Sequence, residues 1–154
     1  MIVWLEKTLV LAIHDRQISE HGGSAGVRDE GLLESALARP RQLHAYGDPA
    51  PDLADLAAAL AHGLARNHPF VDGNKRTAHV AYRTLLALNG AELIATDEEK
   101  YLTMLALAEG KLTERDFAAW ARAWARGEAH EPRPAYRATA RAARSRRGAP
   151  RAAR

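Results

Sequence analysis

Apolar residues recur at helical spacing along most of the chain, and no segment shows the strict alternation expected of a half-buried strand. Four leucines follow one another at intervals of three or four residues, which places them on one helix face: Leu53, Leu56, Leu60 and Leu64. Asp52 can cap this helix, which should run to about Arg66. Residues 74–88 are apolar almost all round, as is typical of a central helix. The pattern predicts an all-α fold, a compact bundle around helix 74–88.

Glycine and proline mark the expected helix ends in the N-terminal half. A first helix over residues 5–20 should stop at Gly22. Asp29 can cap a short second helix, which should end before Pro40 because the residue preceding a proline avoids helical angles. The segment 41–51 contains further glycine and prolines, so it is expected to be a loop.

Two more helices are expected in the C-terminal half. Residues 91–96 read as a short connection that can hold an extended residue or two. Thr96 or Asp97 can cap a helix to about Ala108, and Thr113 can open the last one. Three aromatic residues form the core stripe of that last helix: Phe117, Trp120 and Trp124.

The net charge of +3 hides an asymmetry between the body and the C-terminus. Residues 1–130 carry 14 basic and 18 acidic side chains, whereas residues 132–154 contain eight arginines and no acid. Such self-repelling charge with little to bury predicts a disordered basic tail over residues 131–154, after one folded domain over residues 1–130. The tail could solubilise the protein or make a weak contact with nucleic acid.

Composition also excludes several classes of protein. The chain has no cysteine, which excludes a disulfide framework and a zinc site made of thiolates. No apolar run approaches the roughly 18 residues that span a membrane. The start “MIVWLEKTLV” lacks the features of a signal peptide. A cytoplasmic protein without membrane contact is therefore expected.

The stretch “NHPFVDGNKRTAH”, residues 67–79, places polar residues at the start of the apolar helix. The first N–H groups of a helix lack intrahelical partners, and the helix dipole favours an anion there. Gly73 leaves room for a phosphate to approach the backbone. Three side chains add possible donors: Asn74, Lys75 and Arg76. This combination indicates a phosphate cradle.

Two further residues of the stretch suggest chemistry. An acid next to a phosphate cradle makes sense if a divalent cation lies between them, so Asp72 is a candidate Mg²⁺ ligand. His68 can take a proton from a hydroxyl nucleophile. Together the residues indicate nucleotide-dependent transfer to a hydroxyl. Simpler interpretations remain for each: a polar turn residue for His68, an N-cap for Asp72 and an exposed helix start for Lys75 and Arg76.

The segment “HPFVDGNKR” resembles the signature of the Fic/Doc (Fido) superfamily, His-Pro-Phe-x-Asp/Glu-Gly-Asn-Gly/Lys-Arg. The stretches “IHDRQISEHGG” and “RQLHAYGD” resemble the N-terminal half of the Doc (death-on-curing) toxins, and the similarity covers about residues 5–126. The resemblance implies that His68 is the general base, that Asp72 binds Mg²⁺ and that Phe70 anchors the loop in the core. It implies a nucleotide-phosphate cradle of three residues: Gly73, Asn74 and Arg76.

The resemblance also implies a flap that aligns the target segment beside the site by strand-like main-chain pairing. Six residues match it: Gln42, Leu43, His44, Ala45, Tyr46 and Gly47.

Lys75 bears on which group is transferred. In AMP-transferring Fic enzymes a glycine usually stands there, and a second arginine stands at the position of His79. The Doc toxins have lysine, bind ATP in the reversed sense and transfer its terminal phosphate to a threonine of elongation factor Tu. The resemblance therefore implies ATP and Mg²⁺ as cofactors and favours phosphate transfer, with AMP transfer as the alternative.

The family's inhibitory motif, Ser/Thr-x-x-x-Glu-Gly/Asn, is not matched, since Leu105 precedes Glu109 at the required spacing. The resemblance then implies inhibition by a separate, Phd-like antitoxin.

The sequence leaves two other classes of protein open. A helical metal phosphohydrolase could use His14 and Asp15, but the other histidines show no supporting pattern, so His14 is interpreted as a packing or capping residue. A non-catalytic binding module using the tail is the other alternative.

Overall fold

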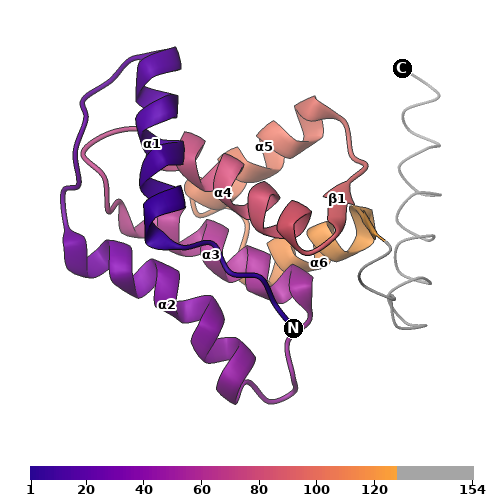
Figure 1. The fold of residues 1–154 in the computed structure, drawn as a ribbon. Helices are drawn as coiled ribbons and strands as arrows, with labels where there is room; N and C mark the ends of the chain where they lie inside the picture. The colour runs from indigo at the N-terminus through magenta and orange to yellow at the C-terminus, as the bar shows by residue number, and fades with distance from the viewer. Residues whose placement is uncertain (128–154) are drawn as a thin grey trace, which may run out of the picture.

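The computed structural model describes residues 1–127 of the chain, and the predicted tail 131–154 lies outside them (Figure 1). The described part contains six helices and two short strands: α1 Lys7–His21, α2 Glu30–Tyr46, α3 Leu53–Asn67, α4 Asn74–Leu88, β1 Ala91–Leu93, α5 Asp97–Ala108, α6 Glu114–Trp124 and β2 Ala125–Gly127. The prediction of an all-α class is confirmed. None of the helices in residues 1–127 has both the length and the apolar character needed to cross a membrane.

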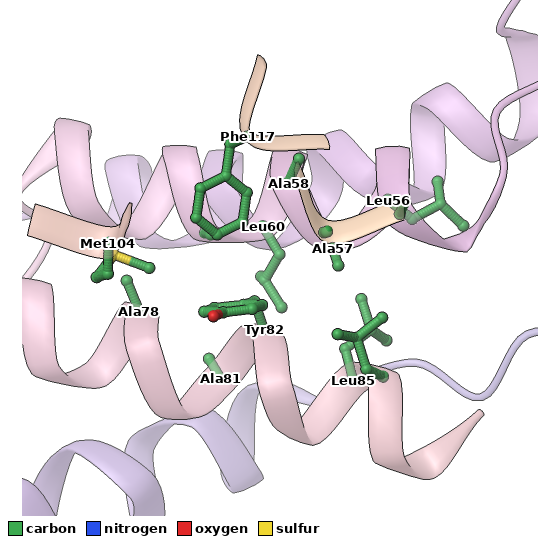
Figure 2. Packing of buried hydrophobic residues seen from close by; sticks show 14 of the residues in the cluster. Leu56, Ala57, Ala58, Leu60, Ala78, Ala81, Tyr82, Leu85, Met104 and Phe117 are labelled. Carbon is green, nitrogen blue, oxygen red and sulfur yellow. The ribbon is translucent and has the colours of Figure 1, made fainter. Parts of the chain in front are cut away.

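The centre of the bundle is shared by α3 and α4. Helix α3 packs against α2, α4, α5 and α6, and α4 packs against α1, α3, α5 and β1. Alanines of α3 such as Ala57, Ala58 and Ala61 are fully buried, which lets the neighbouring helices approach closely. Tyr82 of α4 is also fully buried, and it lies edge-on to Phe117 of α6 (Figure 2). Since α3 buries more of its residues than α4, helix 74–88 is not alone at the centre.

Side chains cap the helices where the sequence predicts them. In each of four helices the capping oxygen accepts a backbone N–H bond in the first turn, and the caps are Asp29, Asp52, Thr96 and Thr113. At α3 the cap is reciprocal, because Asp55 in turn accepts from the backbone of Asp52. Arg122 of α6 donates to both carboxylates, with each shortest distance 2.6 Å. Burial raises the pKa of Asp52, but the bonds from Arg122 outweigh it and hold that pKa at about 2.

Helix α2 does not end before Pro40, so the prediction of a loop from residue 41 was wrong. The helix continues for six residues to Tyr46. A proline inside a helix costs one backbone hydrogen bond and some distortion, but here Pro40 is itself buried in the core. The following turn is held by the N-terminal segment, because Trp4 packs edge-on against His44 and lies under the guanidinium of Arg41. Tertiary contacts thus outweigh the local preference.

The connection after α4 forms a three-residue strand, slightly more than the extended residue or two expected. β1 pairs antiparallel with β2, with Glu92 opposite Arg126. Gly127 is required at this point, because a Cβ there would lie 1.9 Å from the carbonyl oxygen of Gly90. The pairing joins the connection that follows α4 to the segment that follows α6.

Candidate active site

The loop that joins α3 to α4 begins with His68. This residue ends α3 in the left-handed conformation, with φ of 51°. The side chain of Arg28 donates to the carbonyl oxygens of His68 at 2.7 Å and Asn67 at 3.0 Å. A cation is favourable at a helix C-terminus, so Arg28 both satisfies these carbonyls and fixes the chain direction. The His68 side chain itself is exposed.

Main-chain contacts from residues 26–29 hold the middle of this loop. The carbonyl of Pro69 accepts from the backbone N–H groups of Arg28 and Asp29, and the N–H of Val71 donates to Gly26. Phe70 has no exposed surface and anchors the loop in the core, which is the structural role expected of it.

Asn74, the first residue of α4, uses its side chain inside this loop. Its amide oxygen accepts from the N–H of Phe70 at 2.9 Å, and its amide nitrogen donates to the carbonyl of Phe70 at 3.0 Å. The Asn74 side chain is buried. We expected it to donate to a phosphate, whereas the structure uses it to close the turn. What Asn74 can offer an anion is its backbone N–H.

The carboxylate of Asp72 is exposed but oriented. One oxygen accepts from the N–H of Gly73 at 3.0 Å, and the other accepts from the N–H of Ser24 at 3.2 Å. Gly23 makes this approach possible, because a Cβ there would lie 2.8 Å from the carboxylate. Asp72 is therefore not the N-cap of its simpler interpretation, because Gly73 is the N-cap. Its carboxylate accepts from the N–H of that N-cap residue and still has lone pairs facing solvent.

A magnesium ion would fit this carboxylate only with help from a substrate. Within residues 1–127 no cluster of three or more His, Cys, Asp or Glu side chains could hold a metal. Mg²⁺ usually keeps several waters and binds through one or two carboxylates plus phosphate oxygens, so a single oriented carboxylate beside an anion site suits it.

The N-terminus of α4 is the candidate for that anion site. Gly73 is its N-cap with φ of 76°, a conformation that favours glycine, and its carbonyl accepts the first helical bond from Thr77. The N–H groups ahead of Thr77 therefore lie at the positive end of the helix. Lys75 is exposed beside them. The guanidinium of Arg76 donates to the carbonyl of Gly22 at 3.0 Å, which ties the site to the end of α1.

These residues share one cavity of about 770 Å³. At its polar end stand His68 and the residues of the α4 N-terminus: Asp72, Gly73, Asn74, Lys75 and Arg76. Its other lining includes less polar residues of α4 and α5: His79, Val80, Tyr101 and Met104. The cavity thus combines an N–H-rich end, where two basic side chains and one carboxylate stand, with a neutral one, and it has room for a ligand that carries an anionic group.

A family model described as the Fic/DOC family matches residues 4–86, more than half of the chain. The chain belongs to the Fic/DOC family. It is 57% identical to the toxin Doc of Mycolicibacterium smegmatis over 75 residues, which are 48% of this chain and 57% of that protein. It is 35% identical to the protein kinase doc of Escherichia phage P1 over 95 residues, which are 62% of this chain and 75% of that protein.

The expected flap lies apart from the Fic/DOC signature loop in this structure. Its first five residues, 42–46, form the last turns of α2, and Gly47 is the C-cap. None of the six lines the 770 Å³ cavity; a separate hollow of about 380 Å³ is bordered by Gln42, Leu43, Tyr46 and Gly47 together with Arg39. Because helical N–H groups bond within the helix, residues 42–46 cannot pair with a target as a strand does. That part of the expectation was wrong for the conformation observed.

Two residues contact the signature loop in ways that the sequence did not indicate. Arg28 had no recognisable signal, since a lone arginine before a helix is common. His14 was expected to pack, and it does: its ring is 2% exposed and stacks on Phe70 at 3.8 Å. Its ring nitrogen also reaches the signature loop, which the sequence could not indicate.

His79, at the neutral end of the cavity, should make stability depend on pH. Burial lowers its pKa to about 4 from 6.5, and the charges of Arg83 and Lys100 add to this. Between these two pH values the imidazole of residue 79 binds a proton in the unfolded chain but stays neutral in the folded one, so the stability of the fold decreases as the pH falls.

We therefore expect the free energy of unfolding of the wild-type protein to fall by about 1 kcal/mol between about pH 7 and about pH 5 through this group, allowing for solvent screening. In the matched variant His79→Gln the free energy of unfolding should fall by correspondingly less. Urea unfolding at both pH values measures the difference, and equal losses in the two proteins would contradict the assignment.

Proposed function

We propose that this protein is a Doc-like toxin that transfers the terminal phosphate of ATP to a protein hydroxyl. The observation that carries the proposal is the joint placement of His68, Asp72 and Lys75 around the N-terminus of α4, at one end of one cavity. The relative named protein kinase doc supports the same reaction class. The proposed target is a threonine of elongation factor Tu.

In the proposed reaction His68, in its neutral form, takes the proton of the target hydroxyl. The hydroxyl oxygen bonds to the terminal phosphorus as the bond between that phosphorus and the leaving oxygen of ADP breaks. The N–H groups at the start of α4 and the ammonium of Lys75 stabilise the charge on the transferred phosphoryl group. Asp72 would hold Mg²⁺, which supplies further neutralisation of phosphate charge.

Lys75 is the residue on which the choice between phosphate and AMP transfer depends. Its side chain is exposed at the start of α4, where it can bind one end of a triphosphate as a point charge. Incubation with Mg²⁺, cell extract and ATP labelled at the α- or the γ-phosphate tests the choice. We expect label from the γ position alone. Label from the α position alone would establish AMP transfer instead.

The variant Lys75→Gly should lower γ-phosphate transfer by about 10- to 100-fold, because it removes a charge-assisted hydrogen bond worth about 1.5–3 kcal/mol. Lys75→Arg keeps the charge and is the matched control. Undiminished γ-transfer by Lys75→Gly would show that the lysine has no part in binding the phosphate.

As a toxin, the protein would act in the cytoplasm and be held inactive by a Phd-like antitoxin. Expression without that partner should arrest growth by stopping translation. A short adjacent reading frame whose product binds this chain and restores growth would support the pairing.

A further inference from the structure

His14 of α1 lies directly beneath the signature loop. Helix α1 packs against α4 (Figure 1). His14 therefore reaches the signature loop although it stands 58 residues before Asp72 in the sequence. The ring is 2% exposed and stacks on Phe70, with 3.8 Å between centroids and an interplanar angle of 7°. Its Nδ1 faces the exposed Asp15 at 4.0 Å. Packing alone would be served as well by an apolar ring.

The polar contact of this histidine is specific. Nε2 lies 2.8 Å from the main-chain carbonyl oxygen of Asp72. A carbonyl oxygen can only accept, so Nε2 must carry the proton and donate it. The carbonyl of Asp72 is thereby directed into the interior of the protein.

This carbonyl belongs to the peptide that enters α4. A peptide unit is planar, so fixing the carbonyl of Asp72 also fixes the direction of the N–H of Gly73 on its other side. That N–H orients the Asp72 carboxylate at 3.0 Å. A rotated peptide would release the carboxylate and turn a carbonyl oxygen, which repels anions, toward the helix N-terminus.

We propose that His14 is a positioning residue, which locks the Asp72–Gly73 peptide plane and so keeps the α4 N-terminus competent to bind a phosphate group. The proposal rests on the proposed function in one respect, namely that the anion is a phosphate of ATP. Phe70 holds the ring in place, and the Nε2–H bond sets the peptide plane.

Two variants separate the ring from its donor. His14→Phe keeps a flat ring over Phe70 and lacks the N–H, whereas His14→Gln places an amide donor near the position of Nε2 and lacks the ring. We expect His14→Phe to weaken binding of Mg²⁺–ATP about tenfold, equal to about 1.4 kcal/mol, and to shift the amide resonance of Gly73. The affinity of His14→Gln for Mg²⁺–ATP should stay within about threefold of wild type, because the glutamine amide retains a hydrogen bond to the carbonyl of Asp72.

The measurements are calorimetric titration with Mg²⁺–ATP and ¹H–¹⁵N spectra of the free proteins. The proposal is overturned if His14→Phe matches wild type in both, or if His14→Gln binds as weakly as His14→Phe. In the wild-type protein, a His14 ring without a proton on Nε2 would also overturn it, even if neither variant folded. Failure of wild type to bind ATP would refute the proposed function instead, while the Gly73 resonance would still decide the role of His14.

Discussion

His68→Ala is expected to lower phosphate transfer by about 10²- to 10⁴-fold, the usual contribution of a positioned general base. The fold should survive, because the contacts of His68 with its surroundings run through its main chain. Its carbonyl accepts from Arg28, and its side chain is exposed. Label transfer from γ-labelled ATP measures the rate, and thermal unfolding checks the fold.

His68→Asn is the matched control for the backbone. Residue 68 has φ of 51°, which costs most side chains about 1–2 kcal/mol, but asparagine adopts it more readily. Both variants should lose transfer, whereas His68→Ala should be the less stable of the two. Transfer by either variant at the wild-type rate would exclude His68 as the base.

Growth arrest in cells decides between an enzyme and a binding module. His68→Ala and Asp72→Asn should each relieve the growth arrest, because each removes a proposed part of the reaction. If His68→Ala still arrests growth while deletion of residues 132–154 abolishes the arrest, the effect belongs to the tail and the enzyme proposal fails.

Phe70→Ala should destabilise the protein by about 3–5 kcal/mol, the range found for removing a buried phenylalanine ring. Phe70 has no exposed surface, and its ring stacks on His14. Its main chain forms an isolated β-bridge with Val27. Its loss would leave a cavity under the signature loop. Urea unfolding at neutral pH measures the change.

Phe70→Leu should cost clearly less, since it refills most of the space. The neighbouring Val71 is 53% exposed, so Val71→Ala should lie within about 0.5 kcal/mol of wild type. A loss below about 1 kcal/mol for Phe70→Ala would mean that the loop is not anchored by this ring.

Much of the fold was predictable because its determinants are local. The four caps are recognisable from the sequence, because each accepts its bond from the backbone N–H three residues further on: Asp29, Asp52, Thr96 and Thr113. The leucine spacing of α3 is equally local. The candidate site was recognisable for the same reason, because its residues follow one another through a single turn between 68 and 76.

Other features depended on residues distant in sequence. Helix α2 continues through Pro40 because that proline is buried in the core and Trp4 packs on the turn that follows. Residues 42–46 of the expected flap are therefore helical rather than strand-like, while their role in aligning a target stays a prediction. β1 is a strand because β2, more than thirty residues later, supplies its partner.

The sequence by itself determined the helical class, most helix starts, the family and the residues that can carry the chemistry, because spacing and local hydrogen bonds specify these. Only the tertiary structure decided how those residues are used. It turned the amide of Asn74 inward to Phe70, and it brought Arg28 and His14 to the signature loop from 40 and 58 residues away. The contacts of Asn74 and His14 form because buried polar groups must find partners, that of Arg28 forms because the last carbonyls of a helix lack intrahelical donors, and no local pattern says which partner will be nearest.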